Sequence, residues 1–203
     1  MSLGYSSIYI LLQNKMIAVV ETETLTVVKT QEITAFEPTT LVFSIVTDEI
    51  WVGDKKGIIH ILNSEDFSEK ATIEKKHNHS VNVMTVSRDG KLIASGDTYR
   101  YIYVFDTESK AEIGCYAYHT SKITHLNFSK DSTLLVTGAI DLNVGIVTLA
   151  TKAKKIIESK SYYTLIIKTS IEPHQKDLTG AVFDDDNRVI TSGYDCAVRI
   201  WSL

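Results

Sequence analysis

The chain has 203 residues and a formal net charge of −4, with 44% apolar and 23% charged residues, which is typical of a globular protein and excludes an intrinsically disordered one. The net negative charge argues against nucleic acid as the main partner, because counterion release needs clustered Lys and Arg. Two cysteines are too few for a disulfide scaffold, no apolar run reaches the roughly 18 residues of a membrane span, and the N-terminus lacks the pattern of a signal peptide.

The predicted secondary structure is strand throughout, in short runs that follow one another along the chain. These runs are rich in β-branched or aromatic residues, as in 91–96 (KLIASG), 101–106 (YIYVFD), 134–139 (LLVTGA) and 188–193 (RVITSG). Turns rich in Asp, Gly, Ser and Asn separate them at intervals of about ten residues. No stretch keeps a 3.6-residue period over three turns, so no helix is predicted.

One unit of strands repeats along the chain. Each unit has a glycine after its second run and closes on a bulky or apolar residue. The glycines are Gly53, Gly96, Gly138 and Gly193, and the closing residues are Val20, Leu62, Phe105, Val147 and Trp201. Successive closing residues are 42, 43, 42 and 54 positions apart, a spacing typical of four-stranded propeller blades. A β-sandwich of unrelated short strands is the alternative, and the constant phase of the repeat argues against it.

The last unit carries four polar or amphipathic residues at characteristic places, and these are His174, Ser192, Asp195 and Trp201. On these residues the repeat resembles the WD-repeat family, in which such a tetrad forms a hydrogen-bonded chain within each blade. The resemblance implies that Asp195 accepts a hydrogen bond from His174 and that Ser192 links the histidine to Trp201. Polar groups near the end of a blade are partly buried and need such partners, because an unpaired buried group costs about 1–3 kcal/mol.

Three other units depart from the tetrad, and two of them keep part of it. The retained members are His119, Thr137 and Asp141 in the fourth unit and His77 and Ser95 in the third. The departures are Val147 and Phe105 in place of Trp, Tyr99 in place of Asp, and Lys56 in place of Asp in the second unit, which also has no histidine. Two segments in this register, 35–38 (AFEP) and 93–105, together with the ending TSGYDCAVRIWSL, resemble the carboxy-terminal part of the actin-interacting protein 1 family.

The repeat divides the chain into five blades within a single partial β-propeller domain, 1–203. The blades cover approximately 1–33, 34–76, 77–118, 119–172 and 173–203. The first lacks most of its inner strand and the last ends at its third strand, which leaves about four and a half blades. Because the resemblance implies a seven-bladed ring, we expect part of such a ring. A closed ring of five blades, with 5–12 pairing with the last blade, is the alternative.

An insertion of extra residues is predicted at 152–164, before an outer strand at 166–172. It lies between the third and fourth strands of its blade, and the stretch 151–160 (TKAKKIIESK) is basic. It contacts an acidic partner on one interpretation and forms a solvated loop on the other.

No constellation in the sequence supports catalysis, a cofactor or a metal. The glycines stand singly in turns, so no phosphate-binding loop is predicted. His77 and His79 have the spacing for a metal pair, but the repeat explains His77 as a structural hydrogen-bonding residue. Cys115 and Cys196 have no metal-ligand spacing.

Surface recognition is the remaining class of function, because loops on a rigid scaffold carry binding residues. The glycine turns and the loops with histidines share one face of the predicted blades. The candidate partner surface on that face is Lys55, Lys56, Tyr99, Arg100, Asn143 and Tyr194. Tyr and Arg are favoured interface anchors, although an ordinary exposed turn would also place Tyr99 and Arg100 in solvent.

We therefore predict a non-enzymatic protein-binding scaffold with no nucleic-acid or membrane partner. The resemblance implies binding to actin filaments, promotion of filament disassembly with cofilin, and a cytoplasmic location on the cytoskeleton. A scaffold subunit of another multiprotein complex is the alternative. An enzyme built on a propeller would need titratable residues that converge around the central channel, and the sequence shows none.

Overall fold

The computed structural model describes residues 7–149 and 178–202, and every regular element within these ranges is a β-strand. The first sheet contains β1 (Ser7–Leu11), β2 (Met16–Glu21) and β3 (Val27–Glu32). The second contains β4 (Pro38–Ser44), β5 (Glu49–Asp54), β6 (Ile59–Asn63) and β7 (Glu69–Ile73). The third contains β8 (Val81–Val86), β9 (Leu92–Asp97), β10 (Ile102–Asp106) and β11 (Glu112–Tyr116). The fourth contains β12 (Ile123–Phe128), β13 (Leu134–Ala139) and β14 (Val144–Thr148), and the fifth contains β15 (Leu178–Phe183), β16 (Val189–Gly193) and β17 (Val198–Trp201).

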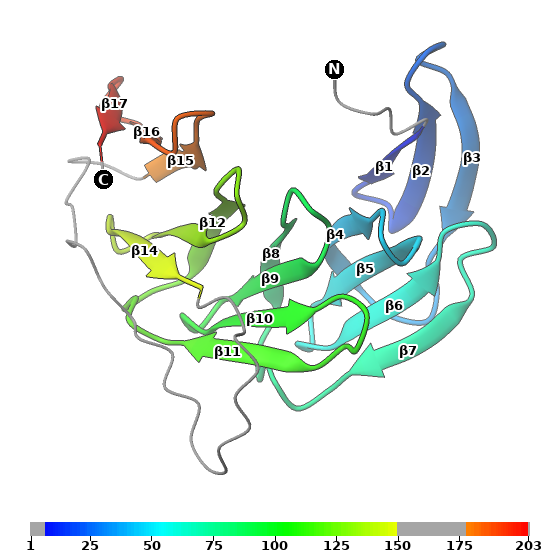
Figure 1. Ribbon diagram of the computed structural model, residues 1–203. Coiled ribbons are helices and arrows are strands. Elements are labelled where there is room, and N and C mark those ends of the chain that lie inside the picture. Colours follow the sequence, from blue (N-terminus) through cyan, green and yellow to red (C-terminus); the bar gives the residue numbers. More distant parts are fainter. Residues whose placement is uncertain (1–6, 150–177, 203) are drawn as a thin grey trace.

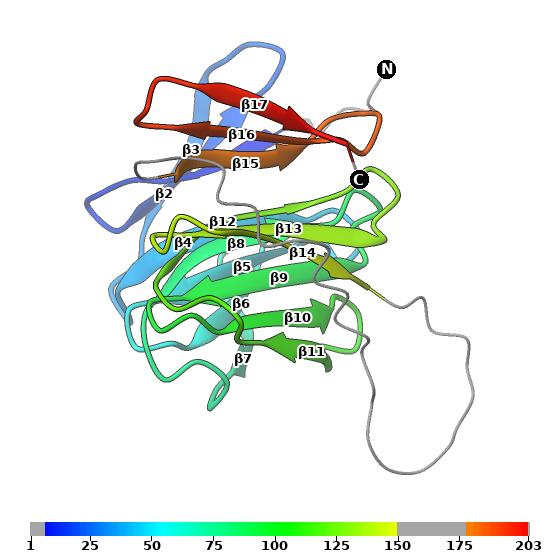
Figure 2. The same cartoon turned by 90° about the vertical axis from the view of Figure 1, so that its left-hand side faces the viewer.

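The five sheets follow one another around an arc, from β1–β3 at one end to β15–β17 at the other (Figure 1). Neighbouring innermost strands contact each other in the order β4, β8, β12 and β15. The view from the side shows the sheets stacked on one another (Figure 2). All strand pairs within the sheets are antiparallel, and consecutive strands are neighbours. The predicted all-β fold of propeller blades is confirmed.

The blades share one register, and this register corrects the predicted alignment of the last unit. The pairing of the first two strands shifts at the same place in blades two to five, as between Val81 and Val83 or between Leu178 and Gly180. This shift pairs Gly96 with Val83, and it pairs Ser192 with Gly180. Ser192 therefore occupies the position of the earlier glycines, and the prediction that Gly193 does so is wrong by one residue.

Close approach of the next blade explains the glycines. A Cβ at Gly96 would lie 2.6 Å from the side chain of Ile123, and a Cβ at Gly138 would lie 2.3 Å from Leu178. Real Cβ atoms do not come this close to a neighbour, so only glycine lets the first residue of the next inner strand pack against the sheet. No further blade follows Ser192 among the described residues, and a side chain fits there.

The first sheet contains the second, third and outer strands of a blade. Its β2–β3 pair has a bulge between Val19 and Val20, as the β6–β7 pair has between Ile61 and Leu62. The turn that follows has Leu25 at a positive φ, as the corresponding turn of blade two has Phe67. The described residues of this sheet include no strand at the inner position of the blade.

Blades two and three are complete four-stranded sheets, whereas three strands each are described for blades four and five. The predicted insertion at 152–164, the predicted outer strand at 166–172 and His174 all lie outside the described residues. Each sheet falls within one of the five predicted blade ranges. Within the described residues β1 pairs with β2 alone, so the alternative in which this segment pairs with the last blade is wrong.

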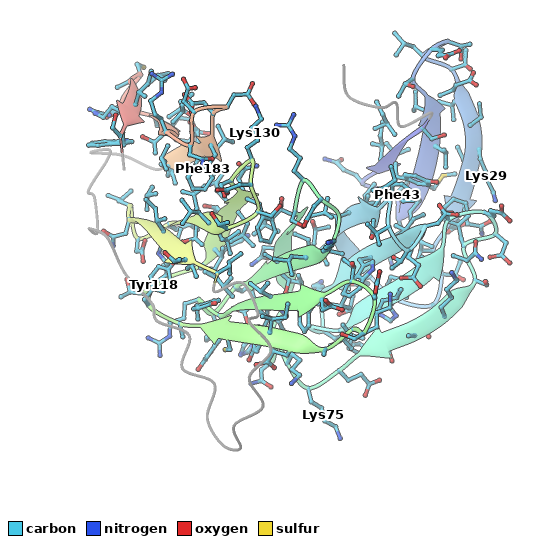
Figure 3. All side chains as sticks on the ribbon, viewed as in Figure 1. Lys29, Phe43, Lys75, Tyr118, Lys130 and Phe183 are labelled. Atoms are coloured by element: carbon cyan, nitrogen blue, oxygen red, sulfur yellow. The ribbon has the colours of Figure 1, made fainter. Side chains whose placement is uncertain are left out.

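The hydrophobic core lies between the blades. Side chains from adjacent sheets fill the space between them (Figure 3). The cluster between blades two and three, for example, combines Trp51 and Ile61 with Val81, Ile93 and Phe105, all fully buried. A strand therefore carries apolar side chains on both of its faces, because a neighbouring blade packs against each face of its sheet.

One ion pair joins blades two and three beside this core. The Lys110 ammonium, in the turn after β10, donates a hydrogen bond to the buried Glu49 carboxylate and lies 5.1 Å from the centre of the Trp51 ring. The Lys70 ammonium lies 3.7 Å from the other Glu49 oxygen. Burial opposes ionisation of Glu49, but the hydrogen bond from Lys110 and the two lysine charges outweigh it, so the pKa of Glu49 lies below its ordinary value.

We expect Glu49→Gln to lower the free energy of unfolding at pH 7 by about 1–2 kcal/mol, because a charge-assisted hydrogen bond between blades is lost. A carboxylate whose folded pKa is lowered stabilises the fold above its ordinary pKa, and this contribution is lost as the pH falls through the folded value. Denaturation measured between pH 7 and pH 3 should therefore show a shallower acid loss in E49Q than in the wild type. Glu108→Gln, at an exposed turn, is the control, and an equal effect of the two substitutions would contradict the role of Glu49.

Candidate functional site

A buried hydrogen-bonded chain holds the turn between β9 and β10 in blade three. His77 Nδ1 lies 2.9 Å from Asp97 Oδ2, and the Ser95 hydroxyl lies 2.7 Å from His77 Nε2. The carboxylate only accepts, so Nδ1 carries the proton and Nε2 accepts from Ser95. The other Asp97 oxygen accepts the backbone N–H groups of Tyr99 and Tyr101 at 2.9 Å each.

The aspartate of blade three was therefore misplaced by sequence reasoning. Tyr99 occupies the position where the repeat pattern expects Asp, but Asp97, two positions earlier, makes the bond to His77. Asp97 does so because it begins the turn, and its side chain mimics a backbone group by accepting from the residues two and four ahead. The fully buried side chains of His77, Ser95 and Asp97 form a satisfied structural network.

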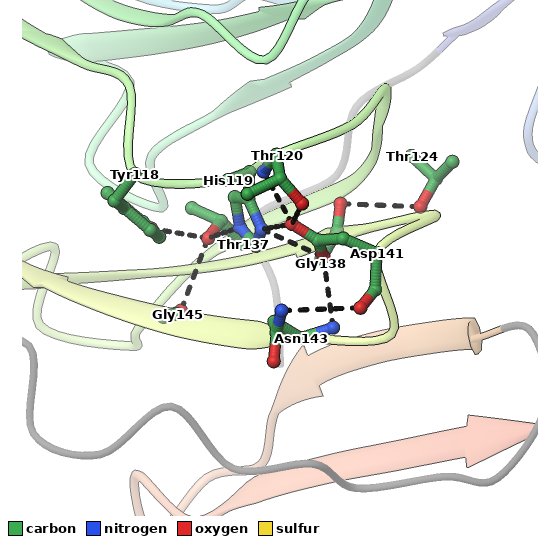
Figure 4. Close-up of polar contacts among 9 residues, drawn as sticks. All are labelled: Tyr118, His119, Thr120, Thr124, Thr137, Gly138, Asp141, Asn143 and Gly145. Carbon is green, nitrogen blue, oxygen red and sulfur yellow. Dashed lines mark hydrogen bonds and ion pairs between the residues drawn. The ribbon is translucent and has the colours of Figure 1, made fainter.

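Blade four has a second chain of this kind (Figure 4). His119 Nδ1 donates to the Asp141 carboxylate at 3.1 Å, and the Thr137 hydroxyl lies 2.8 Å from His119 Nε2. Asp141 also accepts from the backbone N–H groups of Thr120 at 2.7 Å and Asn143 at 3.0 Å. The structure thus brings together the three residues predicted for this unit.

The electrostatics keep this imidazole neutral and this carboxylate ionised. Burial lowers the pKa of His119, although the charge of Asp141 acts in the opposite direction. Burial also opposes ionisation of Asp141, but the hydrogen bonds from Thr120, Asn143 and His119 outweigh it and hold the pKa of Asp141 below its ordinary value.

Tyr118 takes the place of the missing tryptophan in blade four. The Val147 side chain has no N–H to offer Thr137, and the Tyr118 hydroxyl contacts the Thr137 hydroxyl instead. The Tyr118 ring occupies the space above Gly145, where an added Cβ would lie 2.2 Å from the ring. Sequence reasoning missed this pair, whose signal is a tyrosine next to the histidine and a glycine in the strand that usually carries a side chain.

The last blade corrects one member of the predicted tetrad. The indole N–H of Trp201 donates to the Thr191 hydroxyl at 3.0 Å, whereas Ser192 Oγ lies 3.0 Å from the hydroxyl of Thr179. Thr191 occupies the register position of Thr137 and Ser95, so Thr191 rather than Ser192 is the hydroxyl of this blade. Asp195 accepts from Arg199 at 2.9 Å, and its predicted bond to His174 concerns a residue outside the described ranges.

We expect Thr191→Val to lower the free energy of unfolding by about 1 kcal/mol, because the half-buried indole N–H of Trp201 loses its acceptor. Ser192→Ala should cost less, since the half-buried Ser192 hydroxyl is hydrogen-bonded to the Thr179 hydroxyl of the inner strand and not to the Trp201 indole. Chemical denaturation of the two variants compares them directly. A larger loss of unfolding free energy in S192A than in T191V would show that Ser192, and not Thr191, is the structural hydroxyl of this blade.

Blade two replaces the loop histidine with one from a strand. Asp54 accepts the backbone N–H groups of Lys56 and Ile58, as Asp97 does in blade three. His60 lies on β6, with its Nε2 atom 3.6 Å from the Asp54 carboxylate and its Nδ1 atom 2.7 Å from the Glu69 carboxylate. Its ring stacks on the Phe36 ring, with 3.6 Å between the ring centres. The Gly-Asp pair that 53–54 shares with 96–97 was the sequence signal that Asp54 is the turn aspartate of blade two. Lys56, at the position where the repeat pattern expects this aspartate, is exposed to solvent.

Within 7–149 and 178–202, the His, Cys, Asp and Glu side chains form no group of three or more that could hold a metal ion. The sequence offered His77 and His79 as a remote possibility for a metal pair. Both ring nitrogens of His77 instead form hydrogen bonds, one with Asp97 and the other with Ser95. The described part of the chain also contains no helix long and apolar enough to span a membrane.

Comparison with known families matches the repeat directly. The model for "WD domain, G-beta repeat" matches residues 69–106, 111–146 and 166–202, more than half of the chain. The first two matches begin at β7 and β11, so each takes the outer strand of one blade with the first three strands of the next. The chain belongs to the WD-repeat family.

Curated relatives extend well beyond this chain. It is 30% identical over 200 residues to the 66 kDa stress protein of Physarum polycephalum, covering 94% of this chain and 31% of that protein. It is 28% identical over 158 residues to actin-interacting protein 1-2 of Arabidopsis thaliana, covering 76% and 24%. It is 23% identical over 170 residues to actin-interacting protein 1 of Drosophila melanogaster, covering 83% and 26%. The chain thus spans less than a third of the length of these relatives.

The predicted partner surface of this WD-repeat chain lies on equivalent turns of consecutive blades. Lys55, Lys56, Tyr99, Arg100, Asn143 and Tyr194 all stand between the second and third strands of blades two to five. Tyr99 and Tyr194 are 58% and 68% exposed, and Tyr99 stacks on His79 at 3.7 Å. Asn143 is half-buried, and its amide donates to the Asp141 carbonyl, which gives it a local structural role.

The cations of this surface differ in how freely they face solvent. Lys55 lies 3.1 Å from Glu37, which also approaches Lys15, so its charge is partly balanced. Lys56 and Arg100 are exposed at the tips of their turns. The role of these residues in binding a partner stays a prediction.

Proposed function

We propose that this chain is a non-enzymatic binding module that contacts actin filaments and promotes their disassembly together with cofilin, in the cytoplasm. Membership of the WD-repeat family supports a scaffold that binds other proteins. Two relatives that carry the name actin-interacting protein 1 support actin as the partner. The resemblance noted in the sequence supplies the cofilin dependence.

The main observation in favour of a binding role is that each of these turns combines a buried aspartate with exposed side chains. The side chains of Asp54, Asp97 and Asp141 are almost unexposed and each accepts backbone N–H groups, so they fix the conformation of the turns. Tyr99 and Arg100 then stand exposed on a fixed backbone. A binding residue that is already ordered loses less conformational entropy when a partner arrives.

Filament disassembly would follow from differential binding. A protein that binds a strained or cofilin-decorated filament more tightly than a bare filament shifts the population toward that state. The size of the shift is limited by the ratio of the two affinities. This mechanism needs no catalytic group in the propeller.

Cosedimentation of the full 203-residue chain with actin filaments, with and without cofilin, tests the proposal. We expect more of the chain in the pellet when cofilin is present. The charge-reversed variant K56E/R100E should pellet less, whereas K91E/K130E, with two exposed cations reversed in the turns at the opposite ends of the strands, should pellet like the wild type. Absence of wild-type pelleting would overturn the actin role, and equal pelleting of both variants would overturn this choice of surface.

A further inference from the structure

Three neighbouring turns place a charged side chain at the same register position. These turns join the first and second strands of blades three, four and five. Strand pairing aligns the last residues of the three inner strands, and the charged residue lies two positions further on. The inner strands contact one another, so their turns lie side by side. The three charged residues are Arg88, Lys130 and Asp185.

Arg88 and Lys130 hold the Asp185 carboxylate between them. The Arg88 guanidinium lies 3.3 Å and the Lys130 ammonium 3.2 Å from the same oxygen, Asp185 Oδ1. Two cations therefore share one carboxylate. Asp184 is next to it in the turn, but its carboxylate is paired with Arg188 at 2.8 Å. The positive charge of Arg88 and Lys130 is thus only partly balanced.

A hollow of about 560 Å³ lies beside these charges. Its lining combines the two cations and Asp185 with apolar side chains at the ends of the inner strands, among them Phe128 and Phe183. Figure 3 shows Lys130 and Phe183 where blades four and five meet. Arg88 and Lys130 belong to blades that have a packed neighbour on both sides, and their side chains are still 61% and 50% exposed. Apolar walls with a few charged groups that fix orientation are typical of binding sites.

The turns that carry the two cations are fixed by their own hydrogen bonds. The Ser87 hydroxyl donates to Asp89 and accepts the backbone N–H of Leu92, and the turn of blade four repeats this pattern. The Ser132 hydroxyl donates to Asp89 at 3.2 Å and so joins the two turns. The backbone positions of both cations are therefore set before a ligand arrives, which lowers the entropic cost of binding.

Asp185 is a replaceable occupant of its place between the cations. Its side chain is 78% exposed, and exposed ion pairs contribute little to stability, so displacing it costs little. It also offers a single oxygen to both cations, whereas a separate carboxylate can offer one oxygen to each.

We propose that this hollow binds an acidic segment of a partner protein other than actin, whose carboxylate replaces that of Asp185 between Arg88 and Lys130. An apolar residue next to the incoming carboxylate packs against Phe128 and Phe183. Charge complementarity orients the segment and the apolar wall supplies buried area.

The proposed site is separate from the surface proposed for actin. Strand β9 begins after the turn of Arg88 and ends before the turn of Tyr99 and Arg100, so the two surfaces lie at opposite ends of the strands. The acidic partner and the filament can therefore bind at the same time. The K91E/K130E variant, which should leave filament pelleting unchanged, should lose the acidic partner.

Fluorescence anisotropy of a labelled DLDLDL peptide, titrated with the full chain, tests the proposal without actin. We expect saturable binding of this peptide, none of the uncharged NLNLNL peptide with the same label, and an affinity lowered at least about tenfold in R88A/K130A. The matched control K56A/R100A removes the same two residue types from the turns at the opposite ends of the strands, and it should bind the peptide like the wild type. All substituted side chains are exposed, and denaturation midpoints should confirm that each variant folds.

Neutralising Asp185 tests its displacement by the ligand. D185N should raise the affinity for DLDLDL about two- to fivefold, because the peptide no longer competes with an internal carboxylate. D186N removes an equal charge from the same turn, but Asp186 contacts Arg188 instead, so this variant should bind like the wild type. Absence of saturable binding in both the wild type and D185N would overturn the proposal. So would wild-type affinity in R88A/K130A, or equal gains in D185N and D186N.

Discussion

Replacing His119 with leucine is expected to lower the free energy of unfolding by about 2–4 kcal/mol. The imidazole donates to the Asp141 carboxylate and accepts from Thr137 while fully buried. A hydrogen bond to a charged group contributes about 1.5–3 kcal/mol and a neutral one about 1 kcal/mol. Leucine fills a similar volume but leaves the Asp141 carboxylate without this donor. Urea denaturation followed by the fluorescence of buried Trp51 measures the loss.

The same variant should alter the pH dependence of stability. Because the folded pKa of His119 is lowered, the unfolded chain takes up a proton first, and stability falls as the pH drops below about 6.5. H119L should therefore lose less stability than the wild type between pH 7 and pH 5. His125 remains in both proteins, and burial lowers its pKa as well, so the dependence becomes shallower without vanishing.

His79→Ala provides the control for this substitution. His79 is exposed and contacts Tyr99 by stacking alone among the interactions described, so we expect a change within about 0.5 kcal/mol. Comparable losses in H119L and H79A would show that the buried chain in blade four does not stabilise the fold.

Replacing Gly145 with valine is expected to cost about 1–3 kcal/mol, the usual range for overpacking a filled core site. The backbone at this position does not require glycine, but an added Cβ would lie 2.2 Å from the Tyr118 ring. The ring must then move, and the contact between the Tyr118 and Thr137 hydroxyls breaks with it. Burial raises the pKa of Tyr118, which agrees with a phenol held in a closed site.

A double-mutant cycle isolates this steric effect. In a Tyr118→Ala background the space above Gly145 is empty, and the further change to valine should cost less than it does in the wild type. Pairs in direct contact show coupling energies of about 0.5–3 kcal/mol. Gly180→Val is the matched control, because a Cβ there meets only the flexible hydroxyl of Ser192. Strictly additive effects of Y118A and G145V would contradict the proposed exchange of roles.

Several parts of the tetrad pattern were predictable and others were not. His119, Thr137 and Asp141 were found from their spacing because the turn in blade four has the standard length and connections. Asp97 was left out of the predicted tetrad because spacing places the aspartate at Tyr99, whereas an Asp two residues earlier in the turn can accept the same hydrogen bond from His77. Thr191 was overlooked because the misaligned Gly193 moved the expected hydroxyl by one residue.

His60 and Tyr118 show a further limit of spacing arguments. Both side chains reach a turn or strand of their own blade from an element that the repeat pattern does not use for this purpose. The space they fill depends on a small or flat neighbour, Gly145 for Tyr118 and Phe36 for His60. Such compensation becomes visible only when the distances between strands are known.

The sequence by itself determined the strands, their order and the blade period, because alternating apolar residues and turn residues act over a few neighbouring positions. It also determined that the turns on one edge carry the exposed aromatic and basic side chains. The tertiary structure alone decided which polar groups pair in each blade and which apolar residues remain uncovered. Val198 and Val144 have the same residue type and the same register, and only the presence of a packed neighbour makes one exposed and the other buried.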